Sequence, residues 1–343
     1  MKNLFFTKSL LIIALMLCRP AADGKLSAQL PDTGFAVSAE ELDEWVSFLA
    51  SDEMRGRASG SPEMEVAARW IASFYEESGL KPLEGYDSFI HEYSFRSRAG
   101  GRTDERNVIG ILEGNDPGKK NEYILITAHF DHVGVRTAVE GDSIYNGADD
   151  NAAGTCTLLG VARTLKEKKL KPGRSVIFAA VSAEELGLRG SRHIAQNPPF
   201  PLEDVFVNIN FEMTGHSEFL GKNNYYMSGY DYSNLDEIIH GHNKNTGYKL
   251  IDTIALANRL FYMSDNASFA SVYREGDINY GIPGATFATT TFADYIHSPF
   301  DEARLFDFDN MASLVSHFTG LILFLSETDE NLNWTDIRFR RLR

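Results

Sequence analysis

Short apolar runs alternate with amphipathic stretches along most of this chain. Four runs rich in β-branched residues have the length and composition of strands: residues 107–114, 123–130, 175–182 and 205–213. Helical spacing of apolar residues predicts four helices: one from Ser61 to Gly79, one from about Ala152 to Lys168, one starting near Glu185, and one from Asn310 to Leu325. Strands that alternate with helices in this way favour a layered α/β fold with an open sheet.

The first predicted helix has clear start and stop signals. Ser61 suits the N-cap, Pro62 suits the first helical position, and Gly79 suits the C-terminal end. Its apolar face is predicted to contain Val66, Trp70, Ile71 and Phe74.

Composition supports a folded domain and disfavours a polyanionic partner. Of 343 residues 43% are hydrophobic, and 23 Phe and 14 Tyr supply ample surface for a core. The formal net charge is −15, whereas nucleic acid binding needs a basic face, so we expect no nucleic acid partner. We see no internal repeat and no long linker, which predicts one catalytic-type domain over residues 35–330 and a C-terminal tail over 331–343.

Residues 1–28 have the pattern of an export signal. Lys2 and Lys8 precede or begin an apolar stretch, Ser9 to Leu17, that is too short to span a bilayer. We therefore expect an exported protein, periplasmic or secreted, with signal cleavage after Ala22 or Ala28 and no transmembrane segment in the mature chain.

The two cysteines add little to this picture. Cys18 allows an alternative in which a lipid anchors the protein, but Leu17 before it is larger than a lipoprotein signal normally allows. Removal of the signal leaves Cys156 alone, so the mature chain has no internal disulfide.

Carboxylates and imidazoles cluster after the predicted strands. The segments are "TAHFDH" with His129 and Asp131, "GADDN" with Asp149 and Asp150, "SAEELG" with Glu184 and Glu185, "NFEM" with Glu212, and "YIHSPFDEA" with His297. Singly, each has an ordinary explanation, such as a packed histidine, a helix-dipole partner or a turn cap. In an open α/β sheet, however, loops beyond the carboxyl ends of the strands converge on one crevice. Together the segments supply ligands for two divalent ions, with one carboxylate shared and another left to carry protons.

These five segments, in this order, resemble the motif series of the M28 peptidases, the dizinc aminopeptidase family. The similarity extends to "LASDEMRGRASGSPEMEVAARWI" and covers nearly the whole mature chain. It implies a mixed, mainly parallel open sheet with helices on both faces, two Zn²⁺ ions per chain and peptide substrates. The sequence carries no signal for an oligomeric state.

The resemblance also assigns the metal ligands. Asp150 is expected to bridge the two ions. Shared positive charge would explain why two acids, Asp149 and Asp150, occur side by side among small residues. His129 and Glu212 would complete one ion, and Glu185 and His297 the other. Many relatives carry Asp at the position of Glu212, which keeps the carboxylate on a shorter side chain.

Other roles follow from the same resemblance. Glu184 is expected to act as the general base, and Asp131 to orient His129 from behind, as metal-bound histidines usually require. Asp149 is expected to cap or support rather than ligate, and Tyr295 is a candidate to stabilise an oxyanion.

The expected activity is that of a metallo-aminopeptidase that releases N-terminal residues. A water bridging the two metals would attack the scissile carbonyl, and Glu184 would take its proton and pass it to the leaving amine. One alternative is a glutaminyl cyclase-like acyl transferase, whose relatives commonly use one metal. The other is a non-catalytic binding module on the same scaffold, which should have lost ligands that this chain retains.

Overall fold

A computed structural model describes residues 35–96, 100–254, 257–272, 281–290 and 294–335. The predicted signal, with Cys18, lies outside these residues, as does the end of the predicted tail. The helices are α1 Ala39–Leu49, α2 Pro62–Glu77, α3 Gly154–Glu167, α4 Arg189–Gln196, α5 Leu235–Asn243, α6 Ala257–Leu260, α7 Asn266–Ala270 and α8 Phe308–Glu327. The strands are β1 Ile90–Arg96, β2 Arg102–Leu112, β3 Tyr123–His129, β4 Gly134–Val139, β5 Asp142–Tyr145, β6 Ser175–Val181, β7 Val205–Phe211, β8 Asn224–Met227, β9 Lys249–Leu250 and β10 Gly284–Ala288.

Eight of these strands form one sheet in the order β1-β2-β6-β3-β7-β10-β8-β9. The four central strands, β6, β3, β7 and β10, run parallel to their neighbours within this group. At one edge β2 pairs antiparallel with β6 and with β1, and at the other β8 pairs antiparallel with β10. The predicted open, mixed and mainly parallel sheet is therefore confirmed.

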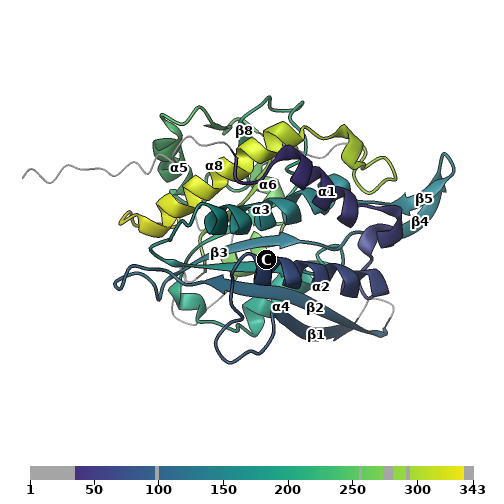
Figure 1. The fold of residues 1–343 in the computed structure, drawn as a ribbon, viewed down its shortest axis with the longest axis horizontal. Helices are drawn as coiled ribbons and strands as arrows, with labels where there is room; N and C mark the ends of the chain where they lie inside the picture. Colours follow the sequence, from purple (N-terminus) through teal and green to yellow (C-terminus); the bar gives the residue numbers. More distant parts are fainter. Residues whose placement is uncertain (1–34, 97–99, 255–256, 273–280, 291–293, 336–343) are drawn as a thin grey trace, which may run out of the picture.

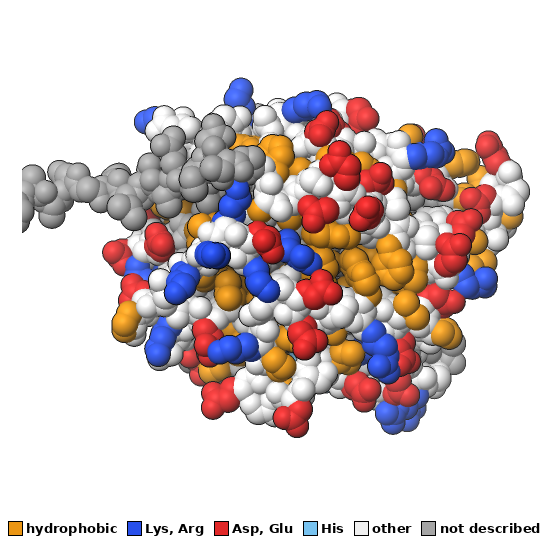
Figure 2. All heavy atoms as spheres, in the orientation of Figure 1, with side chains coloured by type: hydrophobic (Ala, Val, Ile, Leu, Met, Phe, Trp, Pro, Cys, Tyr) orange, Lys and Arg blue, Asp and Glu red, His pale blue; other side chains and the backbone are white. Residues whose placement is uncertain are grey.

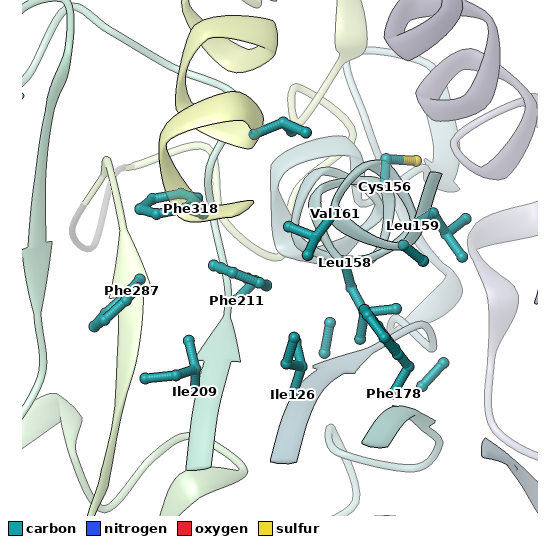
Figure 3. Packing of buried hydrophobic residues seen from close by; sticks show 14 of the residues in the cluster. Ile126, Cys156, Leu158, Leu159, Val161, Phe178, Ile209, Phe211, Phe287 and Phe318 are labelled. Atoms are coloured by element: carbon teal, nitrogen blue, oxygen red, sulfur yellow. The ribbon is translucent and has the colours of Figure 1, made fainter. Parts of the chain in front are cut away.

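Helices cover both faces of this sheet (Figure 1). On one face α1, α2, α3 and α8 pack over the strands, and on the other α4 and α7 do so. Strand residues alternate between the two layers: Ile124 and Ile126 enter the larger core, whereas Leu125 enters the smaller one. Figure 3 shows the larger core, where Phe178, Phe211 and side chains of α3 meet between sheet and helices.

The observed elements match most of the predicted ones, with two corrections. Val66 was predicted to be buried but is 49% exposed, because α2 turns its Ala67 and Ile71 side inward instead. The helix expected near Glu185 begins only at Arg189. Gly187 and Leu188 adopt positive φ values of 96° and 59°, which a helix does not allow, so the chain turns between Glu185 and the start of the helix.

Helix α8 is the one described helix that is long and apolar enough to cross a membrane by length and composition. It packs against α1 and α3, and 67% of its apolar window is buried inside the fold, as expected for a core helix. On the surface, acidic and basic side chains are interspersed over the face shown in Figure 2.

Candidate metal centre

The parallel strands bring the predicted site residues to one edge of the sheet. His129 is the last residue of β3, and Glu212 follows the last residue of the neighbouring strand β7. Thr127 pairs with Asn210, so continuing the register by two residues places Glu212 level with His129. Glu184 and Glu185 follow β6, which pairs with β3 on its other side.

Asp150 lies between two groups of ligand-type side chains. Its Oδ1 is 3.3 Å from Nε2 of His129, and its Oδ2 is 3.1 Å from Nε2 of His297. We call His129 and Glu212 the inner group, since the side chain of His129 is fully buried. A carboxylate whose two oxygens face different imidazoles has the geometry expected of a bridging ligand.

The outer group comprises His132, Glu185 and His297, on the Oδ2 side of Asp150. Nε2 of His297 is 3.0 Å from Oε1 of Glu185. Nδ1 of His132 is 3.2 Å from the same oxygen and 3.7 Å from Oδ2 of Asp150. One ligand atom from each of Asp150, His132, Glu185 and His297 lies within 4.8 Å of the others. His132 was missed as a site residue, although it stands in the "TAHFDH" segment.

Neighbouring imidazoles keep Asp150 ionised, whereas burial favours the protonated form of Glu212. Burial raises the pKa of Asp150, but His129 and His297 outweigh burial and hold it well below its usual value. The carboxylates of Asp150 and Glu185 raise the pKa of His297 to about 10. Burial raises the pKa of Glu212 to about 8. Added positive charge at the site would favour the ionised form of these buried carboxylates.

Divalent cations fit this arrangement. Nε2 of His129 and both ring nitrogens of His132 are buried and form no hydrogen bond, although carboxylate oxygens lie close to them. Buried polar atoms normally have partners, so these nitrogens indicate a missing one. Imidazole nitrogens and carboxylate oxygens are the ligands that zinc takes in proteins.

The turn that carries Glu184 is held from behind by Asp131. Oδ1 of Asp131 accepts a hydrogen bond from the backbone N–H of Glu184 (3.0 Å), and Oδ2 accepts one from that of Glu185 (3.4 Å). Nδ1 of His129 lies 3.2 Å from the backbone oxygen of Asp131 and 3.7 Å from its carboxylate. Asp131 therefore contacts both the histidine and the acid pair, more than the single contact that the sequence predicted.

Asp149 points away from the two groups. Its Oδ1 accepts a hydrogen bond from Gly215 N–H (3.0 Å), and its Oδ2 accepts one from the Tyr295 hydroxyl (2.9 Å). Tyr295, expected as an oxyanion donor, thus ties the His297 segment to Asp149. Asp301 accepts from the backbone N–H groups of both Asp149 (2.7 Å) and Asp150 (3.0 Å), which fixes the acid pair.

Two further polar residues fix the loops of the site and were not predicted. The buried Arg57 guanidinium donates to the backbone oxygens of Phe130, in the β3 loop, and of Gly147, in the Asp150 loop. Asn151 donates to the backbone oxygens of His129 and Phe211, at the ends of β3 and β7. Arg57 lay within the quoted "RGR" segment and Asn151 within "ADDN", but neither residue type carried a chemical signal by itself.

A cavity of about 580 Å³ opens onto these groups. Its acidic wall contains Asp150, Glu184, Glu185 and Glu212, together with His297. The remaining lining residues are largely apolar and include Phe95, Met213, Tyr226, Leu260, Met263 and Ile296. Glu184 thus lies at the cavity wall, where burial and the neighbouring acids raise its pKa well above the usual value.

Fold and site together are those of an α/β protein with a candidate metal centre at the carboxyl edge of its sheet. The family model of peptidase family M28 matches residues 107–319, more than half of the chain. The chain therefore belongs to peptidase family M28.

Individual relatives agree with this membership. Leucine aminopeptidase 1 of Ajellomyces capsulatus is 30% identical over 223 residues, which span 62% of this chain and 55% of that protein. The vacuolar membrane protease of Lodderomyces elongisporus is 24% identical over 72% of this chain, but the match spans only 23% of that protein. The chain thus spans from about a quarter to about half the length of these curated relatives.

Solved structures with the same fold include two of different activity. The zinc aminopeptidase BSAP from Bacillus subtilis has a TM-score of 0.59 and 17% identity, with 84% of this chain and 95% of that chain covered. The glutaminyl cyclase of Porphyromonas gingivalis has a TM-score of 0.61 and 16% identity, with 86% and 99% covered. At these identities the likeness concerns the fold alone.

Proposed function

We propose that this protein is a dizinc aminopeptidase that removes N-terminal residues from peptides. The observation that carries the proposal is the position of Asp150, with one carboxylate oxygen toward His129 and the other toward His297. We infer that His129, Asp150 and Glu212 hold one zinc ion and that Asp150, Glu185 and His297 hold the other. The relatives named as aminopeptidases support the same conclusion.

Glu184 is the proposed general base, and its neighbours prepare it for that role. Two zinc ions bound at the site would polarise the scissile carbonyl and acidify the attacking water. Glu184, at the cavity wall, accepts the proton of that water and passes it to the leaving amine. The Asp131 carboxylate holds the backbone of Glu184 and Glu185, so that one side chain faces the substrate while the other ligates.

Basic side chains are scarce around the cavity. Its four acidic side chains are those assigned above to the zinc ions and to proton transfer, and Arg189 is the one Lys or Arg among the described residues that line it. The Arg189 side chain already donates to the backbone oxygen of Leu186. This bond uses only the Nε–H of Arg189, so the preference for a free N-terminus rests on the relatives named as aminopeptidases rather than on the charge of the cavity.

The apolar residues that line the cavity indicate which N-terminal side chain of a substrate it accepts. Met213, Leu260 and Ile296 offer an apolar surface, which favours a medium or large apolar N-terminal residue over a charged one. Tyr226 adds its ring rather than its hydroxyl, because the hydroxyl donates to the backbone oxygen of Thr290 (2.9 Å).

A substrate panel tests the proposal. We expect leucyl and methionyl substrates with a free amine to be cleaved, with activity lost to a chelator and restored by zinc. The same peptides with an acetylated N-terminus should not react. Cleavage of the acetylated peptides, or cyclisation of an N-terminal glutamine without hydrolysis, would contradict the proposal.

Export and domain division complete the proposal. We infer that residues 1–28 are removed and that residues 35–330 form the peptidase domain, followed by the tail over 331–343. Mass spectrometry of protein from its native host tests the cleavage, and a diacylglyceryl group on Cys18 would establish the lipoprotein alternative.

A further inference from the structure

His132 is a buried histidine with no hydrogen-bond partner at either ring nitrogen. It is 1% exposed, and its ring lies against Gly147, where an added Cβ would come within 2.3 Å of the His132 Cγ. Its backbone N–H donates to the oxygen of Arg57 (3.2 Å), which fixes the residue from the other side. Because close packing holds the ring, we expect the His132 side chain to keep this one rotamer beside the site.

The ring presents Nδ1 to the outer group. This nitrogen lies 3.2 Å from Oε1 of Glu185 and 3.7 Å from Oδ2 of Asp150. Nε2 of His297 lies close to the same two oxygens, 3.0 Å from Oε1 of Glu185 and 3.1 Å from Oδ2 of Asp150. Two imidazoles therefore converge on the same pair of carboxylate oxygens, and the two rings lie 5.5 Å apart between centroids.

A hydrogen bond to Glu185 does not account for this position. Nδ1 is close enough to Oε1 for an ion pair, but the two groups do not have the orientation of a hydrogen bond, and neither ring nitrogen forms one. A cation between the ring and the two carboxylates would satisfy the nitrogen and both oxygens at once.

We propose that His132 is a fourth protein ligand of the outer zinc ion and binds it through Nδ1. This inference rests on the proposed dinuclear site. The outer ion then has four protein ligands, Asp150, Glu185, His297 and His132, whereas the inner ion has three. Sites with four protein ligands are typical of tightly held ions, and sites with three leave a position for water or substrate. We expect the outer ion to be the more tightly held of the two.

The mode of binding gives a test in the unaltered protein. His129 and His297 face Asp150 through Nε2, whereas His132 faces it through Nδ1. In zinc-loaded protein labelled with ¹⁵N-histidine, a long-range ¹H–¹⁵N correlation should show one imidazole with a zinc-shifted Nδ1 and a protonated Nε2. If every zinc-shifted nitrogen is an Nε2, the proposal is overturned.

Substitutions provide the second test. His132→Phe keeps a ring of similar size and removes both nitrogens, so zinc titration against a chromophoric chelator should show one of two ions bound at least about 10- to 100-fold more weakly. His132→Cys should restore tight binding and, with cobalt, add a thiolate-to-cobalt charge-transfer band. His240→Cys, on the exposed side of α5, is the matched control and should lack that band.

The outcomes separate this inference from the proposed function. Two ions bound by His132→Phe with the affinity of the unaltered protein, and no charge-transfer band in His132→Cys, would overturn the ligand assignment and leave the dinuclear peptidase intact. Failure of the unaltered protein to bind two ions would instead overturn the proposed function. Circular dichroism of each variant establishes that it is folded before its metal affinity is compared.

Discussion

The larger core and the carboxyl edge of the sheet are built on the same strands but have opposite chemistry. In the core, Ile126 of β3 and Phe178 of β6 are fully buried among apolar side chains (Figure 3). Three residues beyond Ile126 lies His129, and six beyond Phe178 lies Glu184. In the core, apolar side chains pack against one another. The edge instead holds buried nitrogens without hydrogen-bond partners and acids that repel each other.

This contrast indicates which region stabilises the fold and which one is strained for function. Burial of apolar side chains contributes about 25 cal/mol per Å² of apolar surface removed from water. Unpaired buried polar groups and like charges act in the opposite direction. Removal of a core side chain should therefore lower stability without changing metal binding. Removal of an edge carboxylate whose pKa is raised by burial, such as Glu212, should weaken metal binding without lowering the stability of the metal-free protein.

The largest effect on the edge should come from Asp150→Asn. Because the two oxygens of Asp150 face the inner and outer groups, we expect this variant to lose both zinc ions and all activity. Asp149→Asn is the matched control, since the oxygens of Asp149 accept hydrogen bonds from Gly215 and Tyr295 instead. Metal analysis after dialysis measures the difference, and equal metal content in the two variants would reverse the assignment of the bridging residue.

Glu184→Gln should be the next largest, in activity alone. It keeps the shape of the side chain and its backbone contact with Asp131 but removes the basic oxygen. Since general base catalysis contributes typically about 10²- to 10⁴-fold, kcat should fall by that range while both ions remain bound. Hydrolysis at the unaltered rate by a fully metal-loaded variant would show that another group takes the proton.

Phe178→Ala probes the core side of the comparison. Deleting a fully buried Phe usually costs about 3–5 kcal/mol in the free energy of unfolding, because apolar contacts are lost and a cavity forms. Denaturant unfolding of the metal-free protein measures this loss, and the folded fraction should still bind two ions. Phe178→Leu should cost less, and a metal content that falls in parallel with stability would show that core and edge are not separable.

The fold could be predicted, and so could the gathering of acids and histidines at one edge of the sheet, because both have strong local signals. Short β-branched runs predicted β2, β3, β6 and β7, and the carboxyl-end rule placed His129, Glu185 and Glu212 together. The start of α4 could not be predicted, since it depends on the positive φ of Leu188 at its N-cap and on Asp131 accepting a hydrogen bond from the turn before it.

Residues that act through tertiary contacts could not be predicted either. Arg57 stands about ninety residues before the Gly147 carbonyl that it contacts, and nothing in its neighbourhood marks it as buried. His132 directly follows Asp131 in the sequence. Because His129 and Asp131 already explained the "TAHFDH" motif, nothing in the sequence assigned a role to His132. Only the packing of its ring against Gly147 shows that it faces the outer group rather than solvent.

Glu212→Asp should have the smallest effect. Aspartate keeps a carboxylate at this position on a side chain that is one methylene shorter, so we expect two bound ions and a modest fall in kcat. Glu212→Ala removes the carboxylate, and the inner ion should then be lost while the outer ion stays. A Glu212→Ala protein with two ions and full activity would show that Glu212 is not a ligand.

The pH dependence of stability at Glu212 also tests the difference between the core and the edge of the sheet. Burial raises the pKa of Glu212 to about 8 in the metal-free protein, whereas in the unfolded chain the group has an ordinary value near 4.5. The unfolded chain therefore releases this proton first, and the contribution of Glu212 to folding becomes progressively less favourable as pH rises from about 4.5 to about 8.

Glu212→Gln lacks this penalty, so metal-free Glu212→Gln should be more stable than the unaltered protein at pH 8 and similar to it near pH 4.5. Denaturant unfolding at the two pH values measures the difference. Equal stability of the two proteins at pH 8 would mean that the edge is not strained by this carboxylate, and the distinction between a stabilising core and a strained edge would fail at Glu212.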